Sequence, residues 1–122
     1  MLLKEKTFNE RLQESRKVLK SHEGRVPIVV DKRETSQAPC LDKHKYLVPK
    51  DLTVGQFQYV IRKRLRLHPK QSIFMFANNA IIIQTQIVSQ LYESNKSNDG
   101  FLYIFYDIEN TFGQSLFSGR SM

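Results

Sequence analysis

The sequence has one cysteine, no tryptophan and no long apolar run. A single thiol, Cys40, cannot form a disulfide within the chain, which is typical of proteins that fold in a reducing compartment. The longest apolar or aromatic run is the six residues 101–106, far short of the ~20 residues that a membrane-spanning helix needs. No signal-peptide pattern opens the chain. We therefore expect any contact with a membrane to be peripheral or covalent.

Residues that could carry out catalysis or hold a metal are few and scattered. His22, His44 and His68 fall on separate predicted elements without a cysteine or carboxylate at ligand spacing, so we expect no metal site. Cys40 is four residues from His44, and no acid is placed to orient that imidazole, so we interpret it as a bystander thiol. A phosphate-binding glycine loop is also absent. We expect a protein that uses no cofactor and is not an enzyme.

The chain is basic, because 19 lysines and arginines against 12 acidic residues give a net charge of +7 at pH 7. This balance favours acidic partners, namely peptides, anionic lipid headgroups or nucleic acid, and does not choose among them. The most basic run, residues 62–66, is interrupted by apolar positions on a predicted helix and has no aromatic stacking motif beside it. We therefore expect the chain not to bind nucleic acid.

Hydrophobic periodicity and turn signals predict a single α+β domain. In chain order they give a helix (9–21), two strands (25–30 and 45–49), a helix (54–65), a hairpin (73–77 with 80–83), a short helix (87–92) and a final strand (101–106). Thr53 and Gln56 form a capping box, Asn78-Asn79 suits a tight hairpin, and Pro27 indicates the end or edge of a strand. Without its first helix this order is that of a ubiquitin-like β-grasp, and we expect a mixed sheet of four strands.

A glycine close to the end of the chain, Gly113, is followed by only nine residues. Removal of residues 114–122 would leave a glycine carboxylate with no side chain to obstruct an enzyme, which is the geometry that a protein modifier needs when its C-terminus is passed to an amine. An isolated glycine can equally be a turn in a frayed terminus. The rest of the sequence has to decide between the two interpretations.

Seven segments, in order and without a gap between about residues 7 and 113, carry a resemblance to one family. They are RVPIVV (25–30), LDKHKYLVP (41–49), DLTVGQF (51–57), IRKRL (61–65), QLYE (90–93), GFLY (100–103) and ENTFG (109–113). With these segments the chain resembles the autophagy ubiquitin-like modifiers, the group that contains gamma-aminobutyrate-receptor-associated protein and the light chains of microtubule-associated proteins.

The resemblance implies processing and lipid conjugation at Phe112, Gly113 and Gln114. In the family a papain-like protease, which also deconjugates, cuts after the glycine aligned with Gly113, and ubiquitin-type activating and conjugating enzymes join the new carboxylate to phosphatidylethanolamine. We expect residues 1–24 to be a helical extension packed on the domain, 25–113 the β-grasp core with its C-terminal arm, and 114–122 a tail removed by processing. The implied protein is a cytoplasmic monomer that cycles to autophagosome membranes on its lipid anchor.

The resemblance also implies a groove for short aromatic-x-x-aliphatic peptides of cargo receptors and adaptors, which pair as an extra strand on residues 45–48. The aromatic pocket is expected to be lined by Glu14, Val18, Pro27, Lys45, Leu47 and Phe101. The aliphatic pocket is expected to be lined by Tyr46, Val48, Pro49, Leu52, Phe57, Val60, Ile61 and Arg64.

A second hypothesis is a non-conjugated, peptide-binding adaptor in vesicle trafficking or on microtubules. The sequence also departs from the family pattern at Ile82-Ile83, where many members have two prolines, and at Glu23-Gly24. These departures leave the cleavage and docking positions intact, so both hypotheses keep the same groove and differ only in the fate of Gly113.

Overall fold

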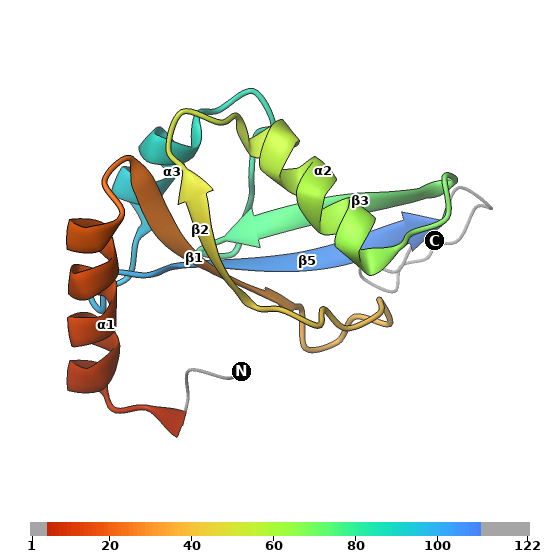
Figure 1. The fold of residues 1–122 in the computed structure, drawn as a ribbon. Helices are drawn as coiled ribbons and strands as arrows, with labels where there is room; N and C mark the ends of the chain where they lie inside the picture. The colour runs from red at the N-terminus through yellow and green to blue at the C-terminus, as the bar shows by residue number, and fades with distance from the viewer. Residues whose placement is uncertain (1–4, 111–122) are drawn as a thin grey trace.

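A mixed five-stranded sheet is the centre of the structure, a computed structural model that describes residues 5–110 (Figure 1). The strands are β1 (Arg25–Lys32), β2 (Lys45–Pro49), β3 (Gln71–Ala77), β4 (Ala80–Ile81) and β5 (Leu102–Asn110), in the spatial order β2-β1-β5-β3-β4. β5 is the central strand, as expected, and runs parallel to β1 and antiparallel to β3. The sheet has five strands and not the four expected, because the second arm of the predicted hairpin also belongs to it. That arm, β4, pairs with the end of β3 over two residues only and is shorter than the predicted 80–83.

Three helices flank this sheet: α1 (Phe8–Ser21), α2 (Val54–Leu65) and α3 (Val88–Asn95). Each of the two longer helices starts with a capping box, made by Thr7 with Glu10 in α1 and by Thr53 with Gln56 in α2. The helix predictions are confirmed; α3 runs further than predicted, to Asn95, whose side-chain amide donates to the carbonyl of Leu91.

The predicted hairpin turn agrees with the structure, whereas the prediction that Pro27 marks the end or edge of a strand is wrong. Asn78 and Asn79 both have positive φ, at 51° and 66°, as a tight turn between β3 and β4 requires. Pro27 lies in an interior strand, opposite Leu47 of β2, but the ladder between β1 and β5 starts only at the next residue, Ile28. The missing amide of Pro27 therefore falls at the end of a ladder rather than inside it.

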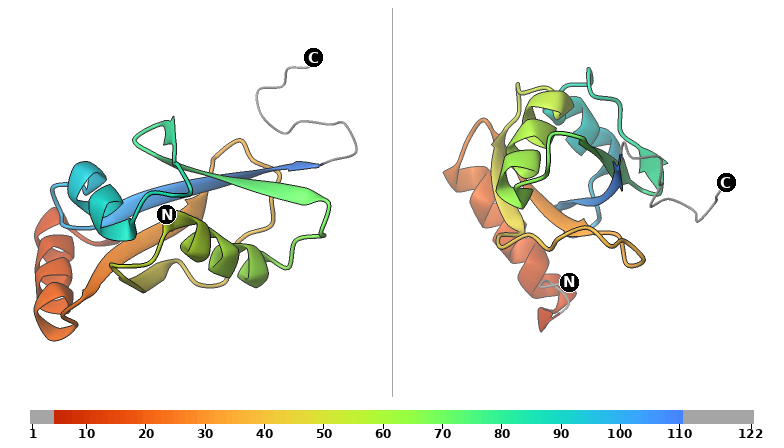
Figure 2. Two further views of the ribbon diagram at one scale, coloured as in Figure 1. Left: turned by 90° about the horizontal axis from the view of Figure 1, so that it is seen from above. Right: turned by 90° about the vertical axis from the view of Figure 1, so that its right-hand side faces the viewer.

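The main hydrophobic core fills the space between the sheet and α2, and Figure 2 shows the sheet curving around that helix. Alternate residues of each strand point into it, as the period of two requires. The buried strand residues on this side are Val26, Ile28, Val30, Tyr46, Val48, Ile73, Met75, Ala77, Leu102, Ile104, Tyr106 and Ile108. From α2 they meet a stripe of Val54, Phe57, Ile61 and Leu65.

The opposite face of the sheet is only partly covered. α1 contacts β1 on this side, and a small second cluster joins Val29 and Phe101, with Tyr103 packed against it. Phe74, Phe76 and Phe105 are half-buried and do not belong to the main core. This face of the sheet is therefore covered by α1 at one end, while the strands at the other end are not covered by a described helix.

Candidate functional site

Within residues 5–110, strand β2 is an edge strand, because β1 is the one strand that pairs with it. The amide of Val30 donates to the carbonyl of His44, so antiparallel alternation turns the backbone groups of Lys45 and Leu47 away from β1. Consistent with this, the carbonyl of Leu47 accepts a hydrogen bond from Nη1 of Arg25 at 3.1 Å. The edge therefore presents backbone donors and acceptors to an incoming strand, with one acceptor already engaged by Arg25.

The residues predicted to form the aromatic pocket lie on the α1 side of this edge. Pro27 and Leu47 are opposite each other in the β1–β2 ladder, with Lys45 on the same face. The Nζ atom of Lys45 is 2.8 Å from Oε2 of Glu14 on α1, so an ion pair bridges the helix and the edge strand. The set is completed by Val18, half-buried on α1, and Phe101, which is buried beside Val29.

Glu14 is held ionised by two lysines. Partial burial acts to raise the pKa of Glu14, but hydrogen bonds from Lys45 and Lys6 outweigh it and bring that pKa below its ordinary value. The second of these bonds is 2.9 Å long. At neutral pH the edge of this pocket therefore carries two cations around one carboxylate.

The residues predicted to form the aliphatic pocket divide into a buried and an exposed set. Tyr46, Val48, Phe57 and Ile61 are all less than 10% exposed and belong to the main core, in which the Tyr46 and Phe57 rings meet edge to face at 5.7 Å. Leu52 and Pro49 are half-buried, and Val60 and Arg64 are exposed. The exposed set is the part that a ligand can reach without opening the core.

Arg64 places a positive charge on the α2 side of the edge strand. Its Nη2 atom is 3.2 Å from Oδ1 of Asp42, a residue of the segment that precedes β2. Nearby, the Nζ atom of Lys43 lies 5.2 Å from the centroid of the Tyr46 ring, whose hydroxyl donates to the Lys43 carbonyl. Cations therefore flank the open edge on the α2 side as well as on the α1 side, where Lys45 stands.

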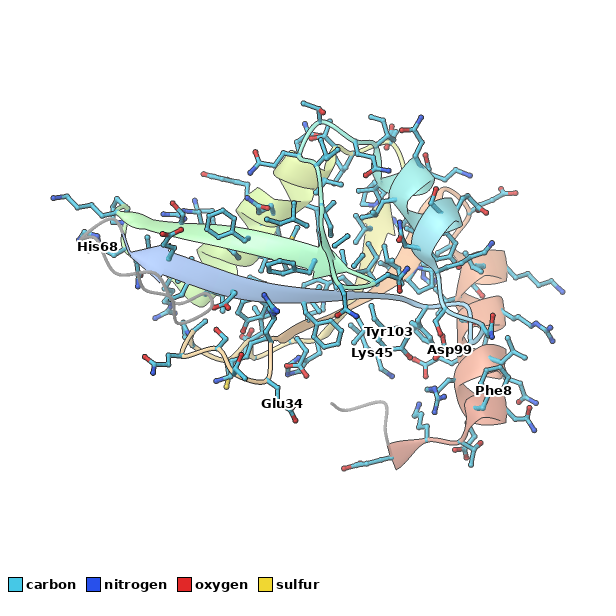
Figure 3. All side chains as sticks on the ribbon, turned by 180° about the vertical axis from the view of Figure 1, so that it is seen from behind. Phe8, Glu34, Lys45, His68, Asp99 and Tyr103 are labelled. Atoms are coloured by element: carbon cyan, nitrogen blue, oxygen red, sulfur yellow. The ribbon has the colours of Figure 1, made fainter. Side chains whose placement is uncertain are left out.

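A buried polar network, which the sequence did not predict, fixes α1 to the sheet. Asp99 is 1% exposed and accepts hydrogen bonds from Nε of Arg11 at 2.9 Å, from the amide of Phe101 and from the hydroxyl of Tyr103, while its carbonyl accepts from the hydroxyl of Ser15 at 2.6 Å. Burial and the bond to Asp99 raise the pKa of the Tyr103 hydroxyl. Figure 3 shows Asp99 and Tyr103 on the side of the sheet where α1 packs.

The signal for this network was present in the sequence as a polar residue in an apolar stripe. Ser15 occupies a core-facing position of α1 and is fully buried. A buried hydroxyl needs a partner. Because that partner is 84 residues away in the chain, the spacing along the helix could not identify it.

Two cavities lie outside the predicted pockets. One, of ≈ 310 Å³, is on the uncovered sheet face and is lined by Arg33, Glu34, Thr35, Phe76, Asn79 and Phe105. The guanidinium of Arg33 sits 4.3 Å from the centroid of the Phe76 ring there. The other, of ≈ 360 Å³, is lined by Gly55, Gln58, Tyr59, Arg62, Ser72, Ile73, Phe74 and Gln84, from α2, from β3 and from the segment after β4. The alternating aromatic residues of β3 were the sequence signal for both.

The predicted cleavage residues Phe112, Gly113 and Gln114 lie outside the described residues. What the structure gives is the point from which this segment starts: Asn110 ends β5 and is paired with Gln71, the first residue of β3. Gly113 is three residues further along the chain.

Within residues 5–110 there is no group of three or more histidine, cysteine, aspartate or glutamate side chains arranged to hold a metal ion. Of the histidines, His44 uses its Nδ1 in a 2.8 Å hydrogen bond with the carbonyl of Val30. Cys40 is a free, exposed thiol. No helix in this range combines the length and apolarity needed to cross a bilayer.

Comparison with known proteins supports the family resemblance over most of the chain. A family model described as "Autophagy protein Atg8 ubiquitin like" matches residues 10–113. Autophagy-related protein 8B of Oryza sativa subsp. indica is 48% identical over 107 residues, which are 88% of this chain and 90% of the relative. Autophagy-related protein 8 of Candida glabrata is 48% identical over 106 residues, 87% and 90% of the two chains.

Solved structures agree with the fold. The crystal structure of Trypanosoma brucei ATG8 superposes with a TM-score of 0.83 at 40% identity, covering 88% of this chain and 93% of that one. Plasmodium falciparum Atg8, solved in complex with a Plasmodium falciparum Atg3 peptide, gives a TM-score of 0.80 at 28% identity, covering 88% and 94%. The predicted ubiquitin-like α+β fold is confirmed, and this chain belongs to the Atg8 family of ubiquitin-like autophagy proteins.

Proposed function

We propose that this ubiquitin-like autophagy modifier is cut between Gly113 and Gln114 and is then joined through Gly113 to phosphatidylethanolamine. The observation that carries the proposal is the extent of the family match, which reaches residue 113 although the sheet ends at Asn110. The match therefore includes residues 111–113, which follow the last described residue of β5 and end in Gly113. A terminal glycine gives partner enzymes an unhindered carboxylate.

The chemistry would be performed by partner enzymes acting on this carboxylate. A papain-like protease adds water across the Gly113–Gln114 peptide bond and releases residues 114–122. At an activating enzyme the carboxylate attacks the α-phosphorus of a nucleoside triphosphate, which forms an acyl nucleotide anhydride and releases pyrophosphate. A cysteine thiol then attacks the acyl carbon, which forms a thioester and releases the nucleoside monophosphate. The lipid amine then attacks the thioester carbonyl, the amide forms and the thiol leaves.

The open edge of β2 is the proposed docking site for partner peptides. An extended peptide would pair with the outward backbone groups of Lys45 and Leu47, with each hydrogen bond contributing ~1 kcal/mol net. Its aromatic side chain would enter beside Pro27 and Leu47, and its aliphatic side chain, three residues on, would contact Leu52 and Val60. Up to four such backbone hydrogen bonds and two anchors of ~1.5 to 3 kcal/mol each sum to ~7 to 10 kcal/mol before the peptide is ordered. Since ~8 kcal/mol corresponds to a Kd of about 1 μM, we expect micromolar or weaker binding.

The conjugating enzyme is one proposed partner of this chain. Plasmodium falciparum Atg8 forms a complex with an Atg3 peptide, and this chain shares its fold. Cargo receptors and adaptors with short aromatic-x-x-aliphatic motifs are the other proposed partners. We place the unconjugated protein in the cytoplasm and the conjugate on autophagosome membranes.

Digestion with an Atg8-processing protease, followed by mass measurement of the product, tests the cut. The expected product is residues 1–113, and loss of any other segment would refute the assignment of Gly113. A Gly113→Ala variant should be processed slowly or not at all, whereas Gly119→Ala, the same change inside the released tail, should be cut normally. Equal processing of the two variants would also refute it.

The adaptor hypothesis differs from this proposal in one observable. A non-conjugated adaptor keeps its cellular distribution when Gly113 is replaced by alanine, because it needs only the β2 edge. A modifier loses its membrane-bound fraction in the same variant and keeps it in Gly119→Ala. Measuring the sedimentable fraction of both variants separates the two functions.

A further inference from the structure

The positive charge of the chain is concentrated at the end of the molecule where β5 finishes. Residues 52–92 contain no aspartate or glutamate, while residues 62–70 contain Arg62, Lys63, Arg64, Arg66 and Lys70. This one segment therefore carries +5 of the net charge of +7. We call the exposed cations Lys63, Arg66 and Lys70 the basic end.

Hydrogen bonds fix the backbone that carries the basic end. The guanidinium of Arg62 donates hydrogen bonds to two backbone carbonyls, from Nη1 to the carbonyl of Gln71 at 2.5 Å and from Nη2 to the carbonyl of His68 at 3.0 Å. Arg66 caps α2 in the left-handed region, with φ of 55° and its amide bonded to the carbonyl of Lys63. The helix end and the turn into β3 therefore form a fixed platform for these side chains.

Two described carboxylates lie toward this end of the molecule, Asp42 and Glu109, the latter in β5 opposite Ser72. Among the described residues, Asp42 pairs with Arg64, and no ion pair is formed by Lys63 or Arg66 with a described carboxylate. Lys63 lies instead over the Tyr59 ring, with Nζ 5.4 Å from its centroid. The other basic surface, on α1, includes the acids Glu10 and Glu14 among its basic residues and lies at the opposite end of the molecule (Figure 1).

The basic end also lies where the described part of the chain stops, three residues before Gly113. Asn110, the last residue of β5, is paired with Gln71, whose carbonyl is bonded to Arg62. Figure 3 shows His68, in the turn between α2 and β3, at the end of the molecule where β5 finishes, with Phe8 of α1 at the far end. Three residues of extended chain reach about 10 Å, comparable with the Debye length of about 8 Å at physiological salt.

From these observations we propose that the basic end binds the surface of an anionic phospholipid bilayer. In the cell this inference rests on the proposed lipid conjugation, which would hold this end, and not α1, within a short distance of the headgroups. A bilayer is favoured over nucleic acid because the short tether would present phosphate-bearing headgroups at this end of the domain. Each lysine or arginine near such a surface strengthens binding by about fivefold.

The test uses the full, unconjugated chain and vesicles, so it requires neither cleavage nor conjugation. Binding is measured by flotation with phosphatidylcholine vesicles that contain or lack phosphatidylserine, at low and at high salt. We expect binding that depends on phosphatidylserine and weakens with salt. The variant Lys63→Gln with Arg66→Gln should bind roughly 10- to 25-fold more weakly, since two cations are removed.

The matched control removes the same charge from α1, as Lys17→Gln with Lys20→Gln, and should change binding by less than about threefold because those cations lie at the far end. Lys63→Gln alone, an exposed change on α2, should weaken binding about fivefold and serves if the double variant is unstable. Equal losses in both double variants would overturn the proposal, as would binding that ignores phosphatidylserine.

A third arm measures binding of an RNA oligonucleotide by the same variants. If the basic-end variant lost only RNA binding and kept its vesicle binding, the surface would be a nucleic-acid site and the proposal would be overturned. Failure of Gly113 to be cut would disprove the proposed function without changing any of these vesicle measurements, so the two failures remain distinguishable.

Discussion

Replacing Gly100 by alanine should destabilise the fold by about 3 kcal/mol and loosen α1 from the sheet. Gly100 has φ of +89° and follows Asp99 in the polar network under α1. A β-carbon built at this position would lie 2.2 Å from the hydroxyl oxygen of Ser15 and 2.9 Å from its Cβ. Either the helix or the turn at Gly100 must therefore shift, because the second contact is with an atom that no rotamer change can displace.

The expected loss of folding free energy has two parts. An L-residue held at positive φ costs about 1 to 2 kcal/mol. Moving Ser15 breaks its 2.6 Å bond to the Asp99 carbonyl and leaves buried polar groups unpaired, which costs about a further 1 to 3 kcal/mol. The chain contains its own control in Gly24, which has φ of +86° and no atom within 4 Å of the position that a β-carbon would take. Gly24→Ala should therefore show only the backbone part.

The assay is urea unfolding of both variants, with hydrogen exchange of the α1 amides as the local readout. Gly100→Ala should lose at least about 1 kcal/mol more than Gly24→Ala, and its α1 amides should exchange faster. If the two variants lost the same free energy of unfolding, the contact with Ser15 would have no energetic role, and the interpretation of Asp99 as the anchor of α1 would be wrong.

Three further predictions concern the open edge and the core behind it. Arg25→Ala should raise the affinity for an aromatic-x-x-aliphatic peptide by up to about fivefold in calorimetry, because it frees the Leu47 carbonyl; weaker binding would contradict this. Stability should fall as pH drops through the lowered pKa of Glu14, by less than about 1 kcal/mol for a partly exposed group, and Glu14→Gln should abolish that component; an unchanged pH profile in the variant would contradict it. Phe57→Ala should lose about 3 to 5 kcal/mol of stability, whereas Val60→Ala, at a position 43% exposed, should leave stability within about 0.5 kcal/mol and weaken peptide binding; equal destabilisation by the two would refute the division of that pocket.

The sign of the pH effect follows from the direction of the Glu14 shift. A carboxyl whose pKa is lower in the folded than in the unfolded protein stabilises the fold above its unfolded pKa. That stabilisation is lost as pH falls through the folded value, when the carboxyl takes up a proton and its hydrogen bonds to Lys45 and Lys6 weaken. The loss therefore belongs to the acidic side of pH 4.5 and is absent at neutral pH.

The elements that local chemistry determines were predictable from the sequence. Thr53 and Gln56 mark the start of α2 through the capping box, and the stripe of Val54, Phe57, Ile61 and Leu65 identifies its buried face. Asn78 and Asn79 provide the positive φ angles of the hairpin. In these cases the residues that determine the structure lie within a few positions of one another.

The features that depend on distant partners were not predictable. β5 continues to Asn110, past the predicted end at residue 106, because Asp107, Ile108 and Glu109 remain paired with β3. Asp107 is buried there and accepts a hydrogen bond from Ser36, 71 residues away. Such hydrogen bonds offset the free-energy cost of burying a carboxylate, and no local sequence pattern predicts them.

The candidate site was predicted in part, for the same reason. The resemblance supplied the residues along β2, and the structure brings Glu14 and Lys45 into contact and sets Pro27 opposite Leu47. The residues alone did not reveal how deeply Tyr46 is buried, because its burial depends on how α2 packs across the sheet and brings Phe57 against its ring.

The most direct measurement of the central claim is an intact-mass spectrum of the protein recovered from membranes of cells in which autophagy has been induced. The expected species is residues 1–113 with one phosphatidylethanolamine attached through an amide at Gly113. A membrane-bound species that retains residues 114–122 and carries no lipid would contradict it.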